Sequence, residues 1–138
     1  MYTPKHFKLE EFLASDHLTK LNITNHPSFE VVENLANLAR HLDIIRDKFG
    51  KAIKVNSGYR CKDLNDYLKS TDTSWHLKGR ASDICPLAKV NREKELIRLK
   101  EIVCDYVGIT RDLSNGKKAC KAFEVIFYPT FIHIALRP

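Results

Sequence analysis

Residues 74–83 of this 138-residue chain read Ser-Trp-His-Leu-Lys-Gly-Arg-Ala-Ser-Asp and carry the most specific spacing in the sequence. His76 and Asp83 stand seven positions apart, and a third candidate, His133, follows in an apolar stretch near the C-terminus. An imidazole inside an apolar strand needs a hydrogen-bonding partner, because burying it unpaired is costly. Two histidines and one aspartate are also a ligand set of an open zinc site. The spacing alone therefore allows either a hydrogen-bonded core histidine or a metal ligand.

The sequence around this stretch predicts helices first and most strands late. Apolar residues at spacings of three and four, ended by Gly50, predict the longest helix. Pro129-Thr130 separates the last two strands and predicts a hairpin. The order of elements favours an α+β fold with an antiparallel sheet and flanking helices, in a single domain over residues 1–138. The expected elements are a short helix or turn over 7–13, helices over 27–49, 61–68 and 91–107, strands over 52–56, 81–84, 123–128 and 131–136, and a polar loop over 110–121 with its turn at Asn115-Gly116.

Composition excludes several classes of protein. Hydrophobic residues make up 43% and charged residues 29% of the chain, which is typical of a globular protein rather than a disordered one. No apolar run approaches the ~18 residues that span a bilayer, and the first twenty residues lack the apolar core of a secretion signal. The four cysteines contain no C-x-x-C pair and are expected to be reduced thiols outside any metal site.

The net charge of +6 indicates attraction to an anionic partner, either nucleic acid or a bacterial wall that carries phosphate and carboxylate groups. No run of Lys and Arg is longer than two residues, and aromatic residues do not alternate with basic ones. The pattern therefore does not favour nucleic acid.

Further motifs accompany the opening stretch. Ser57-Gly58-Tyr59-Arg60 and Leu64-Asn65 precede it, residues 7–12 read F-x-L-x-E-F, and a late histidine lies in an aromatic-aliphatic strand. Together these motifs resemble the zinc D-alanyl-D-alanine carboxypeptidase family, which includes phage L-alanyl-D-glutamate endolysins and shares its fold with the Hedgehog signalling domain. The resemblance covers nearly the whole chain.

The resemblance implies roles for individual residues. It implies that His76, Asp83 and His133 bind one zinc ion per chain. Arg60 would bind a carbonyl or carboxylate of the substrate, since a guanidinium forks onto a pair of oxygens. Ser74 would contact substrate or orient its loop. Trp75 would be partly buried or would form a wall of the substrate groove.

The catalytic acid departs from the family pattern. Relatives carry an acidic residue three positions before the last histidine or at the end of the preceding strand, where this chain has Thr130 and Tyr128. If Pro129-Thr130 is a two-residue turn, Ile126 pairs with His133 and strand alternation places Glu124 and Tyr128 on the His133 face. Glu124 would then act as the general base or orient His133. Tyr128 would line the substrate site.

The resemblance implies a zinc metallopeptidase that hydrolyses amide bonds in peptidoglycan stem peptides, as phage endolysins do. The alternative is a family member that keeps zinc, has lost its base, and serves as a binding or virion structural module. We expect a monomer without membrane or nucleic-acid partners. It would be made in the cytoplasm of the producing cell and would reach the wall after holin release or virion delivery.

Overall fold

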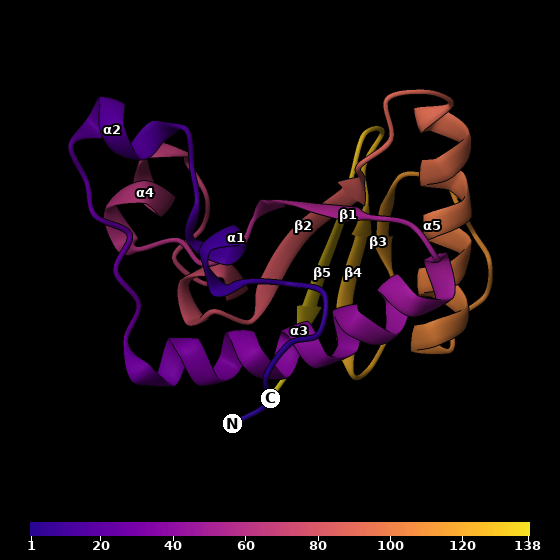
Figure 1. The fold of residues 1–138 in the computed structure, drawn as a ribbon, viewed down its shortest axis with the longest axis horizontal. Coiled ribbons are helices and arrows are strands. Elements are labelled where there is room, and N and C mark those ends of the chain that lie inside the picture. The colour runs from indigo at the N-terminus through magenta and orange to yellow at the C-terminus, as the bar shows by residue number, and fades with distance from the viewer.

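Five antiparallel strands form one sheet in the order β1-β2-β5-β4-β3, with helices packed around it (Figure 1). The computed structural model describes all residues from 1 to 138. The helices are α1 (Leu9–Leu13), α2 (His17–Leu21), α3 (Phe29–Phe49), α4 (Lys62–Tyr67), the short 3-10 helix η1 (Trp75–Lys78) and α5 (Arg92–Val107). The strands are β1 (Ile53–Ser57), β2 (Ala81–Pro86), β3 (Gly116–Lys118), β4 (Phe123–Phe127) and β5 (Ile132–Leu136). The expected α+β class is confirmed.

Helix α3 ends at the predicted residue and begins at Phe29, two residues after the predicted start at Pro27. The Ser28 hydroxyl accepts a hydrogen bond from the Val31 N–H at the start, and Gly50 ends the helix with φ of +74°. The apolar residues at spacings of three and four are buried along one side of the helix. This helix runs along the molecule and packs against α5 (Figure 1). None of the helices combines the length and apolar composition needed to cross a bilayer.

The sheet has one face in the hydrophobic core and one face toward the candidate site. In β4 the side chains of Phe123, Val125 and Phe127 are buried, whereas those of Glu124 and Ile126 between them are only partly buried. The buried set joins apolar residues of α3, α5, β2 and β5 in one core cluster. The period-two alternation of β4 therefore places its apolar side chains in the core and Glu124 on the face of the candidate site.

Strand register brings the candidate residues together. Ile126 pairs with His133 across the β4–β5 hairpin, which confirms the predicted pairing. Asp83 of β2 stands directly opposite His133 of β5, on two neighbouring inner strands of the sheet. These two residues are 50 positions apart in sequence, and only the sheet makes them neighbours.

Three elements differ from the expectation. The loop predicted over 110–121 contains strand β3, which begins at Gly116 and pairs with β4, so Asn115-Gly116 is not the turn of that loop. Its Gly-Lys-Lys sequence has no apolar alternation to reveal a strand, and basic residues are common on sheet edges. Helices α2 and η1 were not predicted, because five and four residues are too few to display a helical period.

Candidate metal centre

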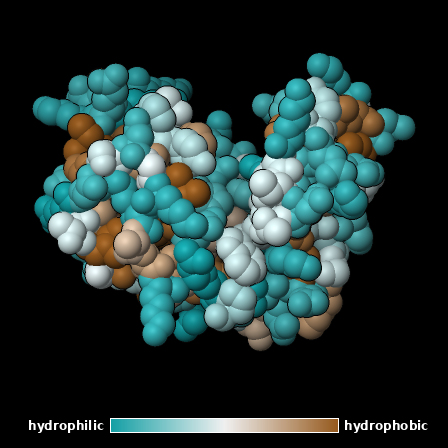
Figure 2. Space-filling view, turned by 180° about the vertical axis from the view of Figure 1, so that it is seen from behind, coloured by the Kyte–Doolittle hydropathy of each residue, from teal (hydrophilic) through white to brown (hydrophobic).

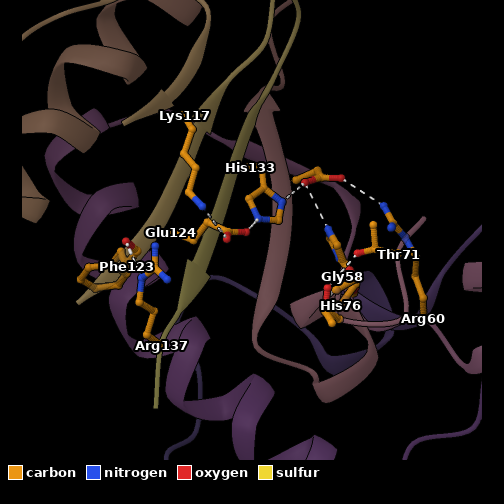
Figure 3. A network of polar contacts seen from close by, with 12 residues as sticks. Gly58, Arg60, Thr71, His76, Lys117, Phe123, Glu124, His133 and Arg137 are labelled. Carbon is orange, nitrogen blue, oxygen red and sulfur yellow. Dashed lines mark hydrogen bonds and ion pairs between the residues drawn. The ribbon is translucent and has the colours of Figure 1, made fainter. Parts of the chain in front are cut away.

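Three side chains from three elements come together in the wall of a cavity (Figure 3). They are His76 from η1, Asp83 from β2 and His133 from β5, and all three are buried. One potential ligand atom from each lies within 4.8 Å of the others. The Asp83 Oδ1 atom is the centre of the group, 3.0 Å from Nδ1 of His133 and 3.4 Å from Nε2 of His76.

Local structure fixes the ring of His76. The Ser74 hydroxyl accepts the backbone N–H of His76 at 3.2 Å and thereby caps η1. The Nδ1 atom of the ring lies 2.6 Å from the carbonyl oxygen of Gly58. A carbonyl can only accept, so Nδ1 carries a proton and Nε2 is the ring nitrogen that faces Asp83.

Two glycines allow this arrangement. A Cβ atom on Gly58 would lie 2.5 Å from the carbonyl oxygen of Phe12 in α1, so only glycine fits there. Gly79 ends η1 with φ of +69°, and a Cβ atom there would lie 2.8 Å from Val31 of α3. The segment after β1, whose Gly58 carbonyl contacts His76, therefore packs tightly against α1, and the end of η1 packs tightly against α3.

Asp83 is held in its charged form. Burial by itself would raise the pKa of its carboxyl, but hydrogen bonds and charge from His133 and His76 outweigh burial, so the pKa lies well below its usual range. The other carboxylate oxygen of Asp83, Oδ2, lies 3.4 Å from Nη2 of Arg60. The Arg60 Nε–H also donates to the Ser57 hydroxyl at 3.1 Å. Burial lowers the pKa of Arg60, and the charge of Asp83 opposes that effect.

His133 is held from both sides. Its Nδ1 faces Asp83, and its Nε2 lies 2.8 Å from Oε1 of Glu124. Burial acts to lower the pKa of His133, but Asp83 and Glu124 together raise it above its ordinary value. Glu124 is bounded in turn by Lys117, whose Nζ lies 3.6 Å from Oε2 (Figure 3). The predicted placement of Glu124 beside His133 is confirmed by the register and by this contact.

The donor set fits a zinc ion. Two imidazole nitrogens and a carboxylate oxygen are the ligands that open zinc sites use. The second nitrogen of His76 bonds to a carbonyl and that of His133 to a carboxylate, which is the usual outer arrangement of metal-binding histidines. No cysteine belongs to the group.

The ligand group lies in the wall of a cavity of about 660 Å³. The α4–η1 segment bounds it on one side and the β4–β5 hairpin on the other, and the surface seen from behind is hollowed between two lobes (Figure 2). All the residues named by sequence for substrate contact line this cavity: Arg60, Ser74, Trp75 and Tyr128. The Tyr128 ring is stacked on that of Phe131, with centroids 4.4 Å apart.

Sequence reasoning missed two contributors to the site. Gly58 was recognised only as part of a motif, and its carbonyl contact with His76 has no signal in the sequence. Lys117 lies on the unpredicted strand β3, so its approach to Glu124 was not foreseen either. Thr130 is exposed in the β4–β5 turn and does not line the cavity.

A model of the family described as Peptidase M15 matches residues 5–115. The matched segment contains His76 and Asp83 and ends before Glu124 and His133. No curated protein matches the chain.

Proposed function

Because the chain belongs to the peptidase M15 family of zinc peptidases, we propose that it hydrolyses amide bonds in peptidoglycan stem peptides. The observation that carries the proposal is the convergence of His76, Asp83 and His133 in the wall of a cavity that Arg60 also lines. The net charge of +6 supports an anionic wall as the place of action. Both family types, D-Ala-D-Ala carboxypeptidase and L-Ala-D-Glu endopeptidase, are compatible with this proposal.

His76 Nε2, Asp83 Oδ1 and His133 Nδ1 would hold the zinc ion. When bound, zinc polarises a substrate carbonyl and makes water a nucleophile near neutral pH. Because the Gly58 carbonyl bonds to Nδ1 of His76, Nε2 would be the nitrogen that binds the ion. Asp83 would contribute negative charge to the cation site. Arg60 has guanidinium N–H groups beyond those used by Ser57 and Asp83, and these would bind a carbonyl or carboxylate of the substrate.

Glu124 and Asp83 are the two carboxylates that line the cavity. Glu124 bonds to the ring nitrogen of His133 that faces away from Asp83, and Lys117 approaches its other oxygen. This geometry supports a positioning role, in which Glu124 fixes the tautomer and orientation of His133. Tyr128 is a poor substitute for a carboxylate base, because a phenol carries its own O–H donor and no negative charge to accept a proton.

The same contact supports a second candidate function. With Glu124 engaged by His133, and with Thr130 and Tyr128 at the positions where relatives have an acid, the chain would bind zinc and peptide without efficient turnover. It would then serve as a binding or virion structural module of phage origin. Loss of a general base lowers turnover by about 10²–10⁴-fold.

Digestion of purified peptidoglycan by the wild type, Glu124→Gln and Tyr128→Glu tests these proposals. Clear wild-type release of stem-peptide fragments supports the peptidase, whereas background activity that Tyr128→Glu raises supports the impaired member. If Glu124 positions His133, the Gln variant loses about 10–100-fold in zinc affinity and regains activity at high zinc. Lost activity with unchanged zinc affinity would instead make Glu124 the base.

A further inference from the structure

A second cavity, of about 430 Å³, adjoins the first. Arg60 and Leu68 line both cavities, so the two meet at these side chains. The walls of the second cavity come from the segment that joins α1 to α2 and from β1. The two cavities therefore form one groove that passes Arg60, with the metal ligands on one side of that residue.

Arg60 is placed to bind a ligand at this junction. Its Nε–H and one Nη2–H donate to Ser57 and Asp83, which uses two of the five N–H groups of a guanidinium. The side chain is only 13% exposed, so an oxygen of the ligand would meet a partly desolvated cation. Because both contacts fix the guanidinium plane, Arg60 can bind a backbone carbonyl of a peptide ligand that extends from one cavity into the other.

The second cavity also borders the edge strand β1. Strand β1 is the outermost strand of the sheet. The Leu87 N–H donates to the Ala52 carbonyl at 3.0 Å, so in an antiparallel ladder Lys54 also faces β2, while the backbone groups of Val55 face outward. Val55 lines the second cavity and its side chain packs against the core. Outward backbone groups of an edge strand pair with extended peptides.

The side chains of the second cavity have both signs of charge. Asp16 and His17 lie on the wall from the α1–α2 segment, and Lys54 and Asn56 lie on the wall from β1. Such a lining suits a polar chain that carries both carboxylate and amine groups. It does not suit an apolar ligand or a purely anionic one.

We propose that the second cavity binds the part of a polar peptide substrate that extends past Arg60. Arg60 contacts Asp83, Asp83 contacts His133, and His133 contacts Glu124 (Figure 3), so the first cavity extends past the ligand group to Glu124, on the side away from Arg60. The substrate then has room on both sides of the metal centre, so the bond that is cleaved is an internal one. This inference rests on the proposed function and adds to it a binding site and the position of the bond.

Binding can be tested apart from catalysis. The zinc-free full chain, labelled with ¹⁵N, is titrated with a free stem pentapeptide and with shorter peptides of the same sequence. The pentapeptide should shift amide signals in both cavities, including those of Val55 and His17, while a dipeptide should shift signals near His76 alone. Shifts confined to the first cavity with every peptide would overturn the inference.

Kinetics on the zinc-loaded enzyme provides the second test. Lys54→Ala should lower kcat/KM about twofold to fivefold for the long peptide, as expected for one exposed charge contact, and leave a short peptide unaffected. Lys94→Ala is the matched control, because it removes the same charge from an exposed position on α5 outside both cavities. Mass spectrometry should identify two peptide products from an internal bond.

The outcomes separate the inference from the proposed function. Release of a single C-terminal amino acid, with no gain from a longer substrate, would overturn the inference and leave a zinc peptidase of the carboxypeptidase type. Binding in both cavities without cleavage would support the inference and favour the impaired family member. No binding and no cleavage of any peptide would overturn both.

Discussion

Asp83 connects the candidate metal site to the candidate substrate site. One oxygen faces His76 and His133, and the other faces Arg60. The carboxylate therefore lies between a cationic guanidinium on one side and two imidazole rings on the other. A substitution at this residue would disturb metal binding and the orientation of Arg60 together.

The ion pair between Asp83 and His133 predicts how the stability of the zinc-free chain depends on pH. The pKa of Asp83 is depressed, so its contribution is present above the ordinary value of 3.8 and is lost as the pH falls. The pKa of His133 is raised, so its contribution is complete below 6.5 and is lost as the pH rises through the raised value. In urea unfolding, the contribution of this pair to the free energy of unfolding should therefore be greatest between pH 3.8 and pH 6.5. In Asp83→Asn the decline above 6.5 should shrink, and an unchanged decline would contradict the pairing.

Replacement of a single ligand tests the metal assignment. His76→Ala removes Nε2 from the group and should weaken zinc binding by more than about 100-fold, leaving little zinc after dialysis. His26→Ala is the control, because His26 is exposed and lies outside the ligand group. Metal analysis should find one zinc per chain in the wild type and in the control. Zinc retained by His76→Ala would refute the ligand set.

At the scale of elements, the short helix η1 determines where the first ligand lies. It is capped by Ser74 and ended by Gly79, and it packs on α3 through the space that Gly79 leaves. The Arg60 N–H also donates to the His76 carbonyl at 3.0 Å, which ties η1 to the segment after β1. A four-residue helix has little stability of its own, so these contacts hold it in place.

Gly79→Ala should show how tightly η1 is held. The alanine would have to keep a positive φ, and its Cβ atom would lie 2.8 Å from Val31. Together these effects predict a loss of about 3 kcal/mol in the free energy of unfolding. Gly50→Ala is a matched control, since φ there is +74° but no atom lies within 4 Å. It should cost about 1 kcal/mol. Equal losses in urea unfolding would show that the contact with α3 does not matter.

At the scale of the whole molecule, the ligand group joins segments that are far apart in the chain. His76, Asp83 and His133 come from a helix, an inner strand and the last strand, and they meet only after the sheet has formed. An ion bound to all three would stabilise the folded state, because the unfolded chain does not hold them together.

Zinc should therefore raise the thermal stability of the chain. With free zinc at about 100 times its Kd, the gain is about 2.7 kcal/mol, which corresponds to roughly 10 °C in Tm for a domain of this size. A chelator should reverse the gain, and His76→Ala should abolish it. An equal shift in His76→Ala would indicate that zinc binds elsewhere.

The elements with strong periodicity and the candidate residues of the site could be predicted from local sequence. Apolar spacing and Gly50 are local signals, so helix α3 and the β4–β5 hairpin could be predicted, as could the face on which Glu124 lies. The spacing from His76 to Asp83 by itself allowed a core histidine or a metal ligand, and the resemblance to the zinc peptidase family favoured the ligand.

How these residues contact one another could not be predicted, because it depends on the packing of distant segments. The contacts of Gly58 with His76 and of Lys117 with Glu124 join elements that are distant in sequence, and no local pattern encodes them. The edge position of β1 and the junction of two cavities at Arg60 depend on strand order in the sheet. Strand order results from packing over the whole core, whereas helix ends and turns depend on a few neighbouring residues.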